Sequence, residues 1–436
     1  MKFEVLKKSH LKRNLLIGVT TIAVLTAGIF TFTKAKYRTT ESIPLVNGTI
    51  NYELSDLNLV GVYIKGDDGY TKSDTIPIEG YVFNGEESYC TVNGEEDTRI
   101  SISYDADTQT LNVSPMTTKG TKCYLYFDEK GITNIEELIA SKTLATRTDF
   151  STTVTEDTTG TIYYADTSKG RTYYFAGNPT DNWVRFGGFY WRIIRINEDG
   201  TLRLIYQGTA ANTTGSNTQI QTSTFNSTLN NNKYVGYMYQ SNQVHGLTSS
   251  STIKGVLDSW YQNNLTSVAD KIDGNAGFCG DRQPSTSSST SNGSGGTGTT
   301  QTYYGGYIRL YGNNKVPTFE CQNESDLYTT SGSEQGNKAL TYPIGLISLD
   351  EAWYAGGLEL NNISYYLYTG QDYWAMSPCS FNATGRYAYV FRVGSNGYLT
   401  GSTVDYTFGV RPVVNLKADT QFSAGDGTSE TPFVVS

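Results

Sequence analysis

The C-terminal fold is decided by the stretch from Tyr373 to Leu416, which contains YWAMSP (373–378), YAYVFRV (387–393), YLTGSTV (398–404) and GVRPVVNL (409–416). The turn sequence GSNG at 394–397 separates two of these runs, as expected for an antiparallel hairpin. A period of two along 387–393 places Tyr387, Tyr389 and Phe391 on one face and Ala388, Val390 and Arg392 on the other. The stretch therefore predicts a sheet near the end of the chain.

The segments that precede this sheet mix strand and helix patterns. Strands are predicted at TYYFAG (172–177), NWVRFGGFYWRIIRI (182–196) and TLRLIYQG (201–208). Apolar residues at helical spacing predict a helix from Thr252 to Val268. A second helix is predicted by the capping pair Ser348 and Glu351. Residues 161–436 are therefore expected to form a large α+β domain.

A low-complexity segment, PSTSSSTSNGSGGTGTTQT, interrupts this domain at 284–302. It has no large apolar side chain, so it cannot repay the entropy of its own ordering, about 1 to 2 kcal/mol per residue. We expect a flexible loop at 284–302.

A smaller acidic β domain is predicted at 41–128. Alternating runs such as VGVYIKG, RISISYDA and TLNVSP are separated by turn residues. Residues 39–128 contain 5 basic and 15 acidic side chains. The following residues, 129–160, begin with a short helical run and become Thr-rich, which is typical of a linker.

The N-terminal residues have the pattern of a membrane anchor. Residues 14–33 carry no charge and, as a helix, would span about 30 Å. Five basic residues lie within 1–13, so the positive-inside rule predicts a cytoplasmic basic tail there and a single transmembrane signal-anchor at 14–33. This interpretation predicts a single-pass cell-membrane protein with its later domains outside the cell. A cleaved signal peptide is the alternative, and it also places most of the chain outside the cytoplasm.

The cysteines and the overall charge exclude several classes of protein. Five cysteines fit an oxidising compartment, and we pair Cys90 with Cys123 and Cys279 with Cys321, which leaves Cys379, although counting alone leaves other pairings open. No cysteine or histidine spacing indicates zinc, so we expect no metal and no cofactor. The formal net charge of -9 disfavours nucleic acid, because phosphates are bound by clustered Lys and Arg.

Three motifs resemble a known group of proteins. LDEAWYAGG (349–357), YWAMSP and GVRPVVNL are similar to a family of bacterial surface modules of unknown function. Longer stretches, such as STIKGVLDSWYQNNL (251–265), look like versions found in membrane-anchored proteins of gut Firmicutes. These modules in turn resemble the C-type-lectin-like fold that includes the formylglycine-generating sulfatase modifiers. The resemblance covers 161–436 and implies a lectin-like domain there.

No catalytic residue is carried to this chain by the resemblance. The sequence lacks the E-P-N and W-N-D motifs of calcium-dependent lectins. Near its end it has Cys379 alone, where the sulfatase modifiers have a cysteine pair. Neither calcium-mediated sugar binding nor oxidase chemistry is therefore implied.

The residues favour binding over catalysis. Tyr supplies 34 of the side chains, and it combines a flat apolar face with a hydroxyl group. We expect a cell-surface binding or adhesion module for a glycan or a protein. Its candidate ligand residues are Tyr373, Trp374, Arg386, Tyr387 and Arg392, whereas Arg411 is expected to be structural.

Two alternatives to a binding module stay open. One is an extracellular hydrolase in which His245 is the base, with a serine or Cys379 as the nucleophile. No G-x-S-x-G motif supports it. The other is a structural envelope protein without a specific ligand.

Overall fold

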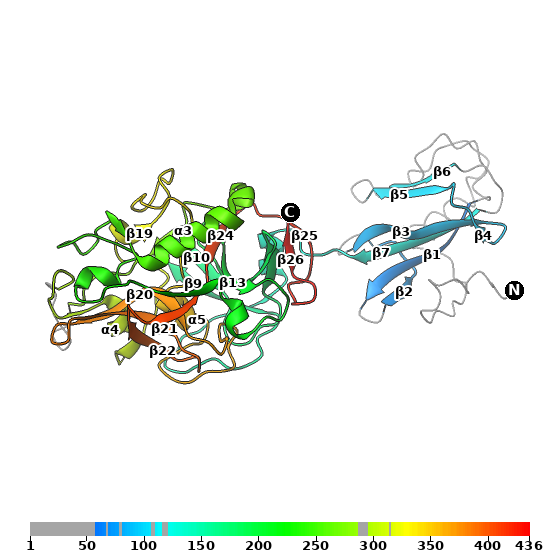
Figure 1. Cartoon of the computed structure of the whole chain (residues 1–436). Helices are drawn as coiled ribbons and strands as arrows, with labels where there is room; N and C mark the ends of the chain where they lie inside the picture. The colour runs from blue at the N-terminus through cyan, green and yellow to red at the C-terminus, as the bar shows by residue number, and fades with distance from the viewer. Residues whose placement is uncertain are drawn as a thin grey trace. The chain divides into compact units, whose positions relative to one another are not determined.

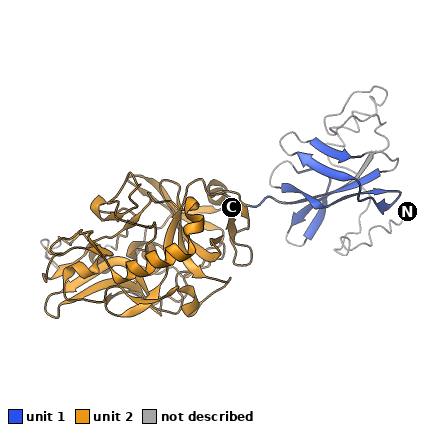
Figure 2. Cartoon of the chain, turned by 45° about the horizontal axis from the view of Figure 1, so that its top comes forward, with its two compact units in different colours: residues 1–131 blue, residues 132–436 orange. Residues whose placement is uncertain are grey.

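The computed structural model describes residues 57–66, 69–77, 81–105, 110–115, 121–286, 295–313 and 315–436. The chain divides into two compact units, residues 1–131 and residues 132–436 (Figure 2). Each unit is built around its own sheets and its own core.

The first unit is a five-stranded sheet with the strand order β2-β1-β7-β3-β4 (Figure 1). A separate hairpin, β5 with β6, shares the apolar core of this sheet. β1 and β7 pair in parallel, whereas the other neighbouring strands pair antiparallel. The strands are β1 (Leu57–Gly66), β2 (Gly69–Ser73), β3 (Tyr81–Val92), β4 (Glu95–Glu96), β5 (Ser101–Asp105), β6 (Thr110–Ser114) and β7 (Thr121–Glu129).

Alternation along β7 gives this sheet two different faces. Cys123, Leu125 and Phe127 pack with the hairpin residues Leu111 and Val113. The intervening side chains, Tyr124 and Tyr126, gather with other tyrosines of the sheet in a second cluster. Cys90 lies directly opposite Cys123 across β3 and β7, and the two form a disulfide. The predicted pairing of these two cysteines is therefore confirmed.

The second unit contains two large sheets and several two-stranded ribbons. The nine-stranded sheet contains β8 (Thr143–Ala145), β9 (Thr161–Thr167), β10 (Gly170–Tyr174), β11 (Trp183–Phe186), β12 (Phe189–Ile196), β13 (Leu202–Gly208), β24 (Val413–Leu416), β25 (Phe422–Ala424) and β26 (Phe433–Val435). The six-stranded sheet contains β14 (Gln221–Thr224), β18 (Thr302–Tyr303), β20 (Tyr373–Asn382), β21 (Tyr387–Val393), β22 (Leu399–Thr403) and β23 (Thr407–Val410). The ribbons pair β15 (Met238–Tyr239) with β16 (Ser249–Ser250) and β17 (Phe278–Cys279) with β19 (Leu327–Tyr328).

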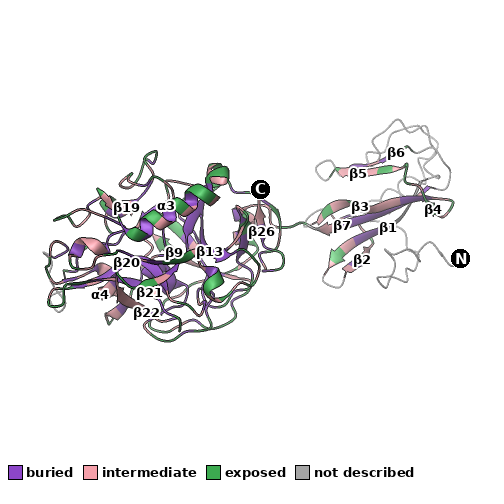
Figure 3. Cartoon of the chain, viewed as in Figure 1, coloured by how far each residue is buried: buried purple, intermediate pink, exposed green. Residues whose placement is uncertain are grey.

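The described helices are all short. They are α2 (Ile135–Ala140), α3 (Thr252–Asn264), α4 (Gly305–Tyr311) and α5 (Leu349–Tyr354), with 3₁₀ turns at Gly215–Thr218, Asn232–Val235, Thr266–Lys271 and Glu324–Asp326. α3 is the longest of them at 13 residues, and it buries Ile253, Leu257 and Tyr261. One apolar core joins helices and sheets, and the buried colouring follows β13 and β20 in Figure 3.

The predicted α+β class, including its lectin-like domain, is wrong at the level of fold class. The described residues form 26 strands and four α-helices of 6 to 13 residues, so the protein is mainly β. Both predicted C-terminal helices exist, and the first of them ends earlier than predicted. The helix expected from 252 to 268 stops at Asn264 and continues as a 3₁₀ turn. The helix after Ser348 has six residues and precedes Gly356, whose φ of +113° cannot extend it.

The prediction of a single-pass membrane protein is also corrected. Among the residues that the structure describes, no helix is both long and apolar enough to cross a membrane. The basic tail at 1–13 and the anchor predicted at 14–33 lie outside the described residues.

The segments predicted as linker and flexible loop are partly built into the second unit. That unit begins at Ile132, and the Arg147 guanidinium donates a hydrogen bond of 2.8 Å to the Tyr354 carbonyl. Of the loop predicted at 284–302, residues 287–294 lie outside the described residues. In the described part, the buried Asn232 amide donates to the carbonyls of Thr297, Gly298 and Thr300.

Candidate functional site

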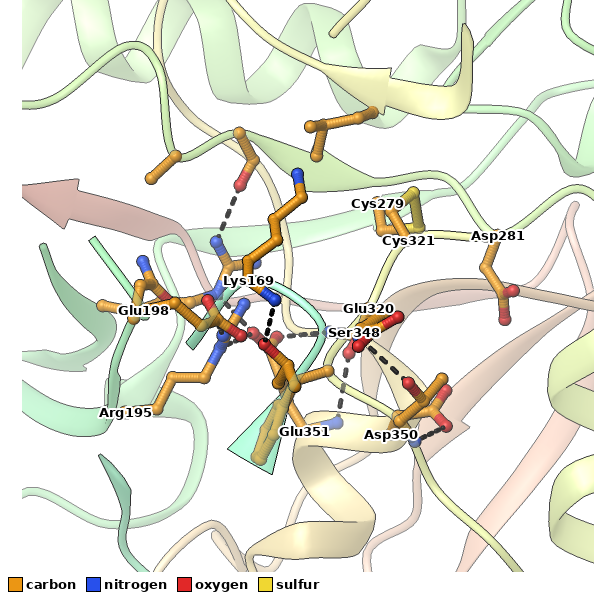
Figure 4. Close-up of a pocket in the computed structure, with 18 of the residues that line it drawn as sticks. Lys169, Arg195, Glu198, Cys279, Asp281, Glu320, Cys321, Ser348, Asp350 and Glu351 are labelled. Atoms are coloured by element: carbon orange, nitrogen blue, oxygen red, sulfur yellow. Dashed lines mark hydrogen bonds and ion pairs between the residues drawn. A yellow bond between two sulfur atoms is a disulfide. The ribbon is translucent and has the colours of Figure 1, made fainter. Parts of the chain in front are cut away.

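A polar cleft of about 340 Å³ lies within the second unit (Figure 4). Its walls come from segments that are far apart in the sequence. They are the β9–β10 turn at 167–169, the end of β12 with the following turn at 195–199, residues from 276–281, residues 318–321 and the start of α5 at 348–351. We call this feature the ion-pair cleft, because it contains Arg195, Arg203, Arg309, Lys169 and the carboxylates of Glu198, Asp199, Asp281, Glu320, Asp350 and Glu351.

The local sequence explains how Glu351 reaches this cleft. Ser348 is the N-cap of α5, and its hydroxyl accepts from the Glu351 backbone N–H while the Glu351 carboxylate accepts from the Ser348 backbone N–H. This capping box turns the carboxylate toward the N-terminus of the helix, where it meets Arg195 and Arg203.

Glu351 is the centre of a buried ion-pair cluster. Its Oε1 lies 3.1 Å from Arg195 Nε and 2.5 Å from Arg203 Nε. Burial acts to raise the pKa of Glu351, but the two guanidinium charges and the Ser348 N–H outweigh burial and hold that pKa below its ordinary value. The Glu351 carboxylate is therefore ionised, and it is bound by Arg195, Arg203 and the Ser348 backbone N–H. Glu198 adds a longer contact of 3.6 Å to Arg195.

Arg309 joins two carboxylates on another wall. It binds Asp350 in a bidentate manner, at 2.8 Å from Nε to Oδ1 and 2.7 Å from Nη2 to Oδ2. The same Nη2 donates to Asp281 Oδ2 at 2.6 Å. Burial and the neighbouring Asp350 charge raise the pKa of Asp281 to about 6, although Arg309 opposes them. Asp281 also has a φ of +47°, a left-handed conformation that, among L-residues, Asn and Asp adopt more readily than most.

Charged side chains at the rim of the cleft have fewer partners than those in its interior. The Ser168 N–H donates to Glu320 Oε1, which connects the tip of the β9–β10 hairpin to the opposite wall. In the described part of the chain, Lys169 Nζ forms no hydrogen bond and no ion pair. Its side chain is exposed and points away from the Arg195–Glu351 cluster in Figure 4. The disulfide between Cys279 and Cys321 borders the cleft and confirms the second predicted cysteine pair.

No metal centre is apparent in the described ranges. Among those residues, no group of three His, Cys, Asp or Glu side chains is arranged to hold a metal ion. The cleft carboxylates bind guanidinium groups or backbone N–H groups instead.

The five residues predicted to bind a ligand do not form one site. Tyr373 and Trp374 are completely buried in the core, where the Tyr373 hydroxyl donates to the Leu367 carbonyl and the Trp374 ring N–H donates to the Ser223 carbonyl. Arg386 and Tyr387 are exposed at the turn between β20 and β21. Arg392 forms an ion pair with Asp372 and lies over the Phe408 ring.

Arg411 has the structural role that the sequence suggested. It is completely buried, and its guanidinium donates to the carbonyls of Tyr206 and Leu367 and to the Gln207 amide oxygen. These contacts connect β24 and its preceding loop to β13 across about half of the sequence.

His245 and Cys379, the residues of the predicted hydrolase, are also not part of the cleft lining. His245 Nδ1 lies 3.6 Å from Asp326 Oδ1, and its Nε2 lies 3.3 Å from the Asn323 amide nitrogen. Burial raises the pKa of the Cys379 thiol to about 12, so this cysteine is neutral at neutral pH and unsuited to nucleophilic attack. Neither His245 nor Cys379 lines the ion-pair cleft.

Sequence reasoning missed the arginines and acids that form the cleft. One signal was present, since Arg195 and Arg203 lie within almost continuously apolar strands, where a charged side chain needs a buried partner. The partner itself could not be read from the sequence, because Glu351 is also explained by a helix start.

Comparison with known proteins adds no assignment. No family model, no curated protein and no solved structure matches this chain. The resemblance of 161–436 to bacterial surface modules therefore stays a prediction, and no residue role is taken from it.

Proposed function

We propose that this chain is a ligand-binding protein that acts outside the cytoplasm and holds a small polar ligand in the ion-pair cleft. The cleft volume of about 340 Å³ falls within the range of small-molecule sites, roughly 300 to 1,000 Å³. Its lining offers both donors and acceptors, and the two disulfides fit an oxidising compartment.

The observation that carries this proposal is that contacts within the protein itself hold the cleft walls together. Arg203 and Glu351 join β13 to α5, and Arg309 and Asp350 join α4 to α5. The Cys279–Cys321 disulfide adds a covalent connection at the rim. A site whose walls are already ordered loses little conformational entropy when a ligand binds, which favours recognition.

A binding screen with a blocked cleft tests the proposal. The purified full-length protein is screened against panels of glycans, amino acids and peptides, with thermal shift followed by calorimetry. Ala276 lines the cleft, so Ala276→Trp should fill it and abolish binding of any hit. The exposed Ala210 does not line the cleft, and Ala210→Trp is the matched control. A ligand bound equally by both variants would contradict the proposal, and a screen without hits would favour a structural envelope protein.

A hydrolase is the second candidate, because Asp281 has a raised pKa of about 6 within the cleft. A carboxyl group with a pKa of about 6 is protonated under mildly acidic conditions and can then serve as a general acid. Turnover of a bound glycan or peptide by the native protein, lost in Asp281→Asn while binding persists, would support this alternative. Turnover lost in His245→Ala would support the base suggested by the sequence.

A further inference from the structure

The rim of the ion-pair cleft presents two opposite charges that are not paired with each other. Lys169 comes from the turn between β9 and β10, and Glu320 comes from the wall that the Cys279–Cys321 disulfide holds. Both residues line the cleft and both are exposed. No ion pair joins them, although the Glu320 carboxylate accepts from the backbone N–H of Ser168, the residue before Lys169.

The charged side chains in the interior of the cleft already form ion pairs with one another. Arg195 and Arg203 bind Glu351, and Arg309 binds Asp281 and Asp350. These contacts use every guanidinium group in the described cleft lining. Lys169 is therefore the lining cation that remains able to bind a ligand anion.

The position of Lys169 is set by the hairpin that carries it. The Thr167 hydroxyl donates to the Gly170 carbonyl and accepts from the Lys169 backbone N–H, which closes the turn. The contact from Ser168 to Glu320 fastens this turn across the cleft. The backbone of the turn is therefore held both by its own hydrogen bonds and by the contact with Glu320, and it places the Lys169 side chain at the rim.

We propose that the ligand is a zwitterion of the amino-acid or short-peptide class, whose carboxylate binds Lys169 and whose ammonium group binds Glu320. This inference rests on the proposed function of the cleft and names its ligand class. A neutral sugar offers hydroxyl groups to both side chains but carries no charge opposite to either of them. A zwitterion replaces the water around both side chains with two hydrogen bonds in which donor and acceptor are both charged, and such bonds are stronger than those between neutral groups.

Four related probes separate the two charges of the ligand. Alanine and dialanine carry both charges, N-acetylalanine carries the carboxylate, and alaninamide carries the ammonium group. Calorimetry on the full-length protein should show the tightest binding for a zwitterion. Binding should also weaken as salt increases, because exposed charges are screened.

Charge-removing variants then test each half of the site. Lys169→Gln should weaken dialanine and N-acetylalanine by about 10- to 100-fold and leave alaninamide unchanged. Glu320→Gln keeps an oxygen that can accept from Ser168, so the hairpin contact should survive while affinity for alaninamide falls. Lys417→Gln and Glu334→Gln remove exposed charges outside the cleft lining and should change nothing.

The outcomes distinguish the ligand class from the cleft itself. A neutral glycan that binds with an affinity sensitive to Ala276→Trp and insensitive to Lys169→Gln would overturn the zwitterion and keep the binding cleft. Dialanine binding unaffected by Lys169→Gln would also overturn it. Binding that survives Ala276→Trp would overturn both proposals.

Discussion

Arg203 Nε lies 2.5 Å from Glu351 Oε1, and this contact joins strand β13 to the first turn of helix α5. The two side chains are 3% and 4% exposed, respectively. Burial lowers the pKa of Arg203, and the Glu351 charge opposes that effect. Each ion is thus tolerated in the interior because of its partner.

Removing Glu351 should strongly destabilise the second unit. Glu351→Ala leaves Arg203 buried without an acid and frees the Ser348 backbone N–H. We expect a loss of about 3 to 5 kcal/mol in the free energy of unfolding, measured by urea denaturation. Glu136→Ala, at an exposed position of α2, is the control and should change stability by less than about 0.5 kcal/mol. Equal stability of the two variants would show that the cluster does not hold the unit together.

Asp281 predicts a specific pH dependence of stability. The pKa of Asp281 is raised from 3.8 to about 6 in the folded protein. Protonation of Asp281 therefore stabilises the folded state fully below about pH 4, and this stabilisation is lost as pH rises through about 6. Asp281→Asn should therefore gain stability relative to the native protein between pH 4 and pH 7, by at most about 3 kcal/mol. Urea titrations at pH 4, 5, 6 and 7 measure the difference, and a constant difference across this range would refute the assignment.

The Cys279–Cys321 disulfide should stabilise the second unit and shape the cleft rim. The two cysteines are separated by 42 residues, so Cys279→Ser should cost roughly 2 to 5 kcal/mol and leave one additional free thiol. Peptide mapping without reduction should recover Cys279 joined to Cys321. A peptide that joins either of them to Cys379 would contradict the structure.

Asn232 should be essential to the ordered end of the low-complexity segment. Its amide donates to three carbonyls in that segment, and its Oδ1 accepts from the Tyr304 hydroxyl. Asn232→Ala should cost about 1 to 3 kcal/mol, because the buried Tyr304 hydroxyl loses its acceptor and the three carbonyls lose their donor. Thermal unfolding measures the cost, and exposed Asn313→Ala provides a control. An unchanged melting temperature for Asn232→Ala would mean that the contacts are dispensable.

Cys379 should resist labelling in the folded protein. Its thiol is buried and its pKa is raised to about 12, so little thiolate exists at pH 7.5. A maleimide reagent should modify it only after denaturation, as followed by intact mass. Rapid labelling of the native protein at a single site would contradict the buried position.

Local sequence patterns predicted much of the secondary structure. The period of two in β21, the turn at 394–397 and the capping box of Ser348 and Glu351 all appear in the structure. Both disulfides also follow the predicted local pairing. The strand, the turn and the capping box depend on residues near one another in the chain, so short windows of sequence contain the information that specifies them.

Tertiary structure alone decided which side chains are accessible and which charges meet. Tyr373 and Trp374 occupy opposite faces of β20, and both are buried because that strand is covered on both sides. Arg203 meets Glu351 because β13 and α5 pack together although the two residues are 148 apart in sequence number, a relationship that no spacing rule indicates. Periodicity determines which face of an element a residue occupies, but what covers that face is set by packing between distant segments.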